Sequence, residues 1–169
     1  MIERSHQSER AYSTAQYSDC GRYRYALTRT WDEQAKRVMF VMLNPSKANE
    51  ITNDPTVERC ERRARALGYG AFRVANIFAW RDTDPHQMRK AKEPVGPDND
   101  AVLLEGADWA DHIIAAWGAH GAHREHGYAM AELLHQTGRP LFHLGLTKAG
   151  HPRHPLYISY KTQPILWKR

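Results

Sequence analysis

Residues 38–56 read "VMFVMLNPSKANEITNDPT", an apolar run followed by a long polar loop. The unbroken apolar run over 38–43 predicts a strand that is covered on both faces. Asn44 and a proline end this strand, and the next helix begins only at Asp54, which can cap it with a proline in the first turn. A loop of this length between a buried strand and a helix is typical of a binding site.

The predicted strands and helices alternate along the rest of the chain. Apolar or alternating stretches predict strands over residues 22–31, 71–80, 112–117 and 141–145, and helical periodicity predicts helices over 54–68, 98–107 and 125–138. Residues 81–97 contain several prolines and are expected to be mostly loop. This order predicts a three-layer α/β/α fold around a central, mostly parallel four-stranded sheet, plus an extra N-terminal strand.

The chain of 169 residues is long enough for one domain with its own core. We predict a polar N-terminal extension over residues 1–21, loose or draped over the domain, and a single domain over 22–169. No apolar run approaches the roughly 20 residues of a membrane span, and no signal-peptide core is recognisable. We therefore expect a soluble cytoplasmic protein without a membrane partner. Its oligomeric state is left open.

The metal-binding residue types are poorly placed for a metal site. The two cysteines, Cys20 and Cys60, form no C-x-x-C motif, which disfavours structural zinc and iron–sulfur clusters. His120, His123 and His126 would spread over about 120° of a helix and would not converge on one ion. We therefore expect no metal. The net charge of +5 and the pI near 9.3 fit nucleic-acid binding, although many basic proteins never bind nucleic acid.

The segments that leave the four core strands are rich in residues that bind polar ligands. They read "NPS" after the first strand, "NIFAWR" late in the second, "WGAHG" after the third and "TKAGHPRHPLY" after the fourth. The carboxyl ends of parallel strands meet at one edge of a sheet and form the usual ligand site. We therefore expect these segments to form a single site.

In order and spacing, these segments resemble the motifs of the uracil-DNA glycosylase superfamily. The matching stretches are "MLNPS", "VAN", "WGAH" and the loop from "HP" to "HPL". Over residues 23–167 the chain more closely resembles a bacterial and phage family of unknown function that shares "LNPS", "DPT", "WG" and "HPLY". The resemblance implies a glycosylase-like fold and hydrolysis of the N-glycosidic bond of a damaged or modified base in DNA, a reaction for which we expect no cofactor. Membership of the unknown-function family alone assigns no activity.

The resemblance assigns the first loop to water activation. It implies that Asn44 positions the attacking water through its amide oxygen, and that the loop backbone at Pro45 and Ser46 cradles a phosphate. The carboxylate at the second position of the superfamily motif is absent here, so Asp54 is the candidate base. The alternative, from turn chemistry alone, is that Asn44 and Pro45 only turn the chain.

Base recognition and leaving-group stabilisation fall on later strand exits. Asn76 interrupts an apolar strand and, by resemblance, reads the edge of the base; alternatively its buried amide bonds to neighbouring backbone. His154 or His151 is implied to donate to the departing base. His154 heads "HPLY" and is preferred, whereas His151 fits the wider spacing of the superfamily loop. Either histidine can instead simply fix its own turn.

Four further residues are candidate substrate-binding groups, each with a plainer interpretation. Lys148 and Arg59 can contact phosphates, but basic side chains of this kind are usually only solvated. Trp117 and Gly118 can shape a pocket and let a ligand approach the backbone, or they can serve packing alone.

Two other functions stay open. A non-catalytic module of the same fold could bind nucleic acid or a modified base, which suits the missing carboxylate. An enzyme of phage origin could act on nucleosides or modified bases. The sequence does not distinguish single- or double-stranded DNA, RNA, and a free nucleobase or nucleoside as the partner.

Overall fold

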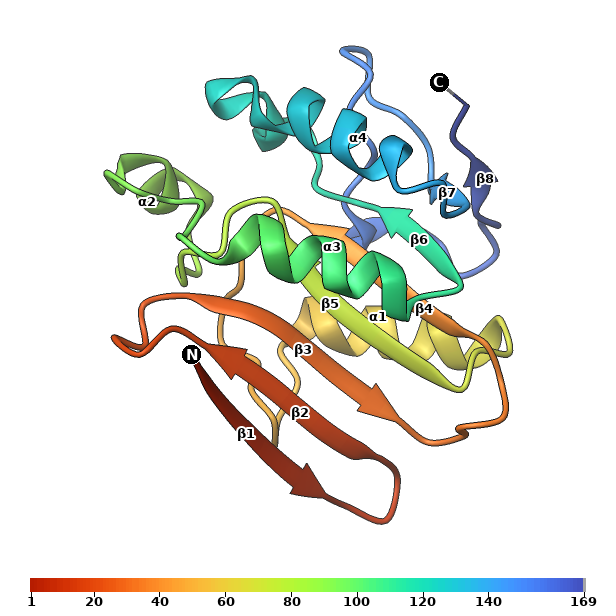
Figure 1. Cartoon of the computed structure of the whole chain (residues 1–169). Helices are drawn as coiled ribbons and strands as arrows, with labels where there is room; N and C mark the ends of the chain where they lie inside the picture. Colours follow the sequence, from red (N-terminus) through yellow and green to blue (C-terminus); the bar gives the residue numbers. More distant parts are fainter. Residues whose placement is uncertain (169) are drawn as a thin grey trace.

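Four parallel strands form the centre of a mixed eight-stranded sheet in the computed structural model, which describes residues 1–168 (Figure 1). Across the sheet they stand in the order β5 (Ala71–Asn76), β4 (Arg37–Met42), β6 (His112–Ala115) and β7 (Leu141–His143). The prediction of an α/β fold with a parallel core is confirmed.

Antiparallel strands extend the sheet at both edges. On one side β3 (Arg24–Thr30) pairs with β5, β2 (Tyr12–Tyr17) pairs with β3, and β1 (Ile2–Gln7) pairs with β2. On the other side β8 (Ile165–Leu166) pairs with β7. The predicted sheet of four strands and one N-terminal addition was therefore too small.

The prediction that residues 1–21 are loose or draped over the domain was wrong, because β1 and β2 form a hairpin there. Ser13, Ala15 and Tyr17 of β2 are buried, whereas every residue of β1 is exposed. A polar edge strand has no apolar face that would mark it in the sequence. Its ladder of backbone hydrogen bonds depends on a partner strand, which only the tertiary structure supplies.

Helices cover both faces of the sheet (Figure 1). α1 (Pro55–Ala66) packs on one face, and α3 (Asn99–Trp109) and α4 (His126–Gln136) pack on the other. Neighbouring residues of β4 point to opposite faces: Phe40 belongs to the core beneath α1, and Val41 to the core beneath α3 and α4. Burial on both faces explains the unbroken apolar run of this strand.

Two helices begin with the same aspartate–proline signal. The Asp54 carboxylate accepts the backbone N–H of Val57 at 2.9 Å and caps α1, as predicted. α2 (Pro85–Lys90) lies in the stretch that was predicted to be loop, and Asp84 caps it by accepting the N–H of His86 at 2.9 Å. Within residues 1–168, no helix has the length and apolar character that crossing a membrane requires.

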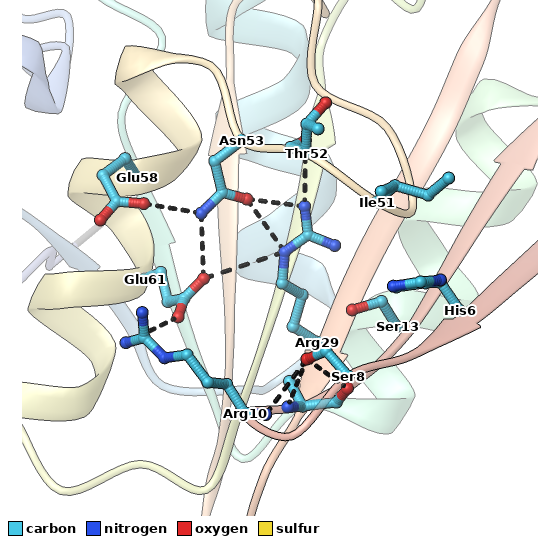
Figure 2. Close-up of a pocket in the computed structure, with 11 residues that line it drawn as sticks. His6, Ser8, Arg10, Ser13, Arg29, Ile51, Thr52, Asn53, Glu58 and Glu61 are labelled. Carbon is cyan, nitrogen blue, oxygen red and sulfur yellow. Dashed lines mark hydrogen bonds and ion pairs between the residues drawn. The ribbon is translucent and has the colours of Figure 1, made fainter.

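The loop from β4 to α1 is held against the sheet by a buried side chain of β3. The Arg29 guanidinium donates to the side-chain oxygen of Asn53 at 2.6 and 3.0 Å and to the backbone oxygen of Asn49 at 2.9 Å. The Asn53 amide in turn donates to Glu58 and Glu61 on α1 (Figure 2). The charged groups around this hollow of about 380 Å³ therefore bind one another and fix the loop.

The strand order creates a crevice at one edge of the sheet. From β4 the chain crosses to β5 on one side, and the later strand β6 pairs with β4 on the other side. The connections that leave β4 and β6 therefore run in opposite directions, which opens space at their carboxyl ends.

Candidate functional site

A pocket of about 450 Å³ lies at this crevice. Its lining comes from the loops after β4, β5 and β6 and from the short 3-10 turn η2 (Pro155–Tyr157). The polar side chains that line it include Asn44, Ser46, Asp54, Asp82, His120 and His154, and the apolar ones include Leu43, Trp117, Leu156 and Tyr157. The pocket combines apolar walls with a few convergent polar groups, as small-molecule sites do.

Residues from separate parts of the predicted site meet in this pocket. The predicted site residues among its lining are Asn44, Ser46, Asp54, Trp117, Gly118 and His154. The structure therefore places residues from three of the four strand exits around one pocket. The roles of these residues stay predictions.

A second, small cavity of about 30 Å³ shares several of these side chains. Asn44, Ser46, Asp54 and His154 line both spaces, and Arg24 lines only the small one. A cavity of this size with several polar groups around it can hold a water molecule. The geometry therefore provides a water-sized polar space next to a larger pocket.

Asn44 is oriented by the loop that follows β5. Its side-chain nitrogen donates to the backbone oxygens of Asp82 at 2.8 Å and Pro45 at 3.3 Å. The two carbonyls fix which end of the amide carries the nitrogen. Within residues 1–168 the amide oxygen of Asn44 has no hydrogen-bond partner, so it remains free to accept a hydrogen bond.

Two carboxylates line the larger pocket. Both oxygens of Asp54 accept backbone N–H groups, from Val57 at 2.9 Å and from Ala48 at 3.2 Å. Asp82 accepts the N–H of Asp84 through one oxygen at 3.0 Å. Sequence reasoning missed Asp82 because it lies in a polar stretch whose place beside Asn44 depends on the pairing of two loops.

The ring of His154 is oriented by its own turn. Its Nδ1 accepts the backbone N–H of Leu156 at 3.3 Å. An accepting Nδ1 leaves the proton of a neutral imidazole on Nε2. Burial lowers the pKa of His154 below its ordinary value of 6.5, against the opposite influence of the Asp54 charge. At neutral pH, His154 is therefore an uncharged side chain with an N–H donor at Nε2.

Glycines bring the third strand exit close to this histidine. Gly118 has a φ of 75°, and its N–H donates to the Pro152 oxygen at 2.7 Å. A Cβ at Gly118 would lie 3.3 Å from the Cβ of His154. Next to it, Trp117 lies against Gly121 and Gly127, where any Cβ would overlap the indole ring. Trp117, which is 1% exposed, is therefore fixed in the core next to the pocket.

An exposed aromatic ring stands at the pocket rim. Tyr157 lines the pocket although 91% of its surface is exposed. A large exposed ring beside a concave site is typical of surfaces that stack on a ligand. The sequence signal was the last letter of "HPLY", which sequence reasoning used only to identify the family motif.

Arg24 is a buried charge beneath the site. Only 1% of the residue is exposed, and its Nη1 donates to the Ala48 oxygen at 2.7 Å. Its Nε has no hydrogen-bond partner within residues 1–168. Burial lowers the pKa of Arg24 to about 10, although the Asp54 charge favours the charged form. An arginine in an alternating strand gives no sequence signal of this position.

Two predicted residues lie outside the pocket. Asn76 ends β5 and is fully buried; within residues 1–168 neither polar atom of its side chain has a hydrogen-bond partner. His151 is 2% exposed, and its ring packs on Tyr128 with 4.7 Å between centroids. Burial lowers the pKa of His151. Since only His154 lines the pocket, the geometry favours His154 over His151.

The remaining candidates also lie outside the pocket. Arg59 donates to the backbone oxygens of Pro155, at 3.3 Å, and of Ile158, so it secures the turn that follows His154. Pro45 is buried in the loop after β4, and Lys148 is exposed in the turn after β7.

Comparison with known proteins gives a family and no activity. No curated protein and no solved structure matches the chain. One family model matches residues 24–156, a range that begins at the buried Arg24 and includes the segments lining the pocket up to Leu156. The resemblance to a family of unknown function is thereby confirmed, and the resemblance to glycosylases is not. The chain belongs to the family described as "Protein of unknown function (DUF1643)".

Proposed function

We propose that this protein is a DNA glycosylase-like enzyme that hydrolyses the N-glycosidic bond of a damaged or modified base in DNA. The observation that carries the proposal is that Asn44, Asp54 and His154 line one pocket, although they come from separate segments of the chain. The likeness of the fold to the uracil-DNA glycosylase superfamily is part of the same proposal.

The proposed reaction joins a water oxygen to C1′ of the sugar and releases the base with the electron pair of the C1′–N bond. The water occupies the small cavity and donates a hydrogen bond to the free amide oxygen of Asn44. Its proton passes to a carboxylate of the pocket, Asp54 or Asp82. His154 donates from Nε2 to the base oxygen, where negative charge develops as the bond breaks.

The pocket dimensions and walls support a single base as the occupant. Its volume of about 450 Å³ falls in the range of small-ligand sites. Leu156 offers an apolar surface to one base, and Tyr157 at the rim can stack on a neighbouring base or take the place of an extruded one.

A non-catalytic binding module is the second candidate, and the geometry of Asp54 favours it. Both oxygens of this carboxylate already accept backbone N–H groups, so a water molecule would share them with these bonds. If neither Asp54 nor Asp82 serves as the base, the pocket would bind a modified base without cleaving it.

A cleavage assay tests the proposal. Single- and double-stranded oligonucleotides with uracil, hypoxanthine, oxidised pyrimidines or hypermodified pyrimidines are incubated with protein and then treated with alkali, which breaks abasic sites. We expect strand breaks with the wild type and at least about 100-fold slower cleavage with Asn44→Ala. The matched control is Lys47→Ala, an exposed neighbour in the same loop, which should cleave at the wild-type rate.

Urea unfolding of each variant establishes that loss of cleavage is not loss of fold. Full activity of Asn44→Ala would exclude its role in positioning water. If none of the oligonucleotides is cleaved but one of them is still bound, the enzyme proposal is rejected in favour of the non-catalytic binding module.

A further inference from the structure

A second open pocket, of about 300 Å³, lies beside the proposed base pocket. The side chains of Arg89, His120, His123 and Arg124 line it, together with two alanines. They come from α2 and from the 3-10 turn η1 (Ala119–Glu125), which precedes α4. The two pockets share His120 and one of these alanines, so they are direct neighbours.

The lining of this second pocket is basic. Among the described residues no carboxylate lines it, and neither Arg89 nor Arg124 forms an ion pair. Arg124 donates to the backbone oxygens of Ala91 at 3.4 Å and Lys92 at 3.2 Å, which places its guanidinium between η1 and the end of α2. Two arginines without acidic partners are thus presented in one concave surface.

The pKa values of the two histidines in this pocket indicate the same excess of positive charge. Burial lowers the pKa of His123, and the charges of Arg124 and Arg89 lower it further. Burial likewise lowers the pKa of His120, with further contributions from His86 and Arg89 and an opposing one from Asp84. The field in this pocket therefore favours an anion.

We infer that this basic pocket binds a phosphate group of the nucleotide whose base enters the neighbouring pocket. Planar guanidinium groups match the geometry of phosphate oxygens, and a pair of them can hold one phosphate from two sides. The inference rests on the proposed function for the base, and it narrows the substrate class. A free nucleobase or nucleoside leaves the arginines unpaired, whereas a nucleotide or a nucleic-acid strand fills both pockets.

Binding of a fluorescein-labelled oligo-dT strand of about 12 nucleotides tests the inference, measured by fluorescence anisotropy over a series of salt concentrations. We expect Arg89→Gln/Arg124→Gln to weaken binding about tenfold at low salt. The slope of log affinity against log salt should fall by about 0.7, the value for one phosphate of a single strand. The matched control is Arg4→Gln/Lys36→Gln, which removes two exposed positive charges that line neither pocket and should change neither quantity appreciably.

Equal affinity and equal salt slope in the wild type and the Arg89/Arg124 variant would overturn the inference, as would no binding of the strand by the wild type. The two proposals fail separately. Absence of cleavage together with Arg89- and Arg124-dependent binding rejects the glycosylase and keeps the phosphate site. Cleavage by the Arg89/Arg124 variant at the wild-type KM rejects the phosphate site and keeps the glycosylase.

Discussion

At the scale of single residues, Gly118 and Gly138 share one backbone geometry and differ in their surroundings. Both have a φ of 75°, in the left-handed region that disfavours a side chain. A Cβ on Gly118 would lie 3.3 Å from the Cβ of His154, whereas a Cβ on Gly138 would meet nothing within 4 Å. Comparing alanine substitutions at the two glycines therefore separates the effect of backbone strain from the effect of displacing His154.

We predict that Gly118→Ala and Gly138→Ala each lower the free energy of unfolding by about 1 kcal/mol, the cost of a left-handed alanine. Only Gly118→Ala should also raise the pKa of His154 toward its ordinary value, because the added methyl group pushes the ring out of its buried position. Urea unfolding measures the first effect and an NMR titration of the ring the second. An unchanged His154 titration in Gly118→Ala would contradict the close approach.

At the scale of elements, α1 supports the segment that carries His154 and Tyr157. Arg63 of α1 is 2% exposed and donates to the backbone oxygens of Ile158 at 3.0 Å, Ser159 at 3.1 Å and Thr162 at 3.0 Å. The helix thus satisfies carbonyl groups of an irregular segment that has few partners of its own. The arginine-rich face of α1, which sequence reasoning could interpret as solvated, is partly a clamp.

Replacing this clamp should loosen the irregular segment. Arg63→Met removes one donor from each of three carbonyls. Ile158 keeps the bond from Arg59 and Ser159 keeps the bond from the Thr162 N–H, but the Thr162 oxygen is left without a donor among residues 1–168. We therefore predict a loss of about 2 kcal/mol in unfolding free energy. Amide hydrogen exchange over residues 155–162 should become faster. Arg62→Met is the control: Arg62 is exposed and pairs with Glu58 at 2.9 Å, and a surface ion pair of this kind contributes little to stability. Equal exchange rates in the two variants would disprove the clamp.

At the scale of the whole molecule, burial of histidines couples stability to pH. Burial is the main cause that lowers the pKa of His112, His120, His123, His126, His143, His151 and His154 below the ordinary value of 6.5. Each of these side chains takes up a proton more readily in the unfolded chain than in the folded one. Their contribution to stability is therefore complete above about pH 6.5 and is lost as the pH falls.

We predict that the urea midpoint at pH 5.5 is lower than at pH 7.5. Carboxylates, which titrate near pH 4 when unfolded, remain mostly charged in this window and contribute little. Unfolding curves recorded by tryptophan fluorescence at both pH values provide the test. A midpoint that is constant or rises on acidification would show that the buried histidines do not control stability.

The sequence by itself determined the parallel core, the start of α1 and the family. These features depend on local patterns. One is an apolar run that is buried on both faces, and the other is Asp54, which caps α1 by accepting the N–H of Val57, three residues further along the chain. It also predicted Asn44, His151 and His154 as candidate site residues, because asparagine and histidine beside proline at strand ends are typical of ligand-binding loops. Their roles stay predictions.

Only the tertiary structure decided the N-terminal hairpin and much of the site's lining. β1 has no buried face and so leaves no apolar pattern in the sequence; it is placed by its pairing with β2, which in turn pairs with β3. Arg24 and Asp82 reach the site through the pairing of strands and loops that are distant along the chain. The choice of His154 over His151 likewise follows from which ring faces the pocket. Contacts of this kind depend on the path of the whole chain, and local residue patterns do not encode that path.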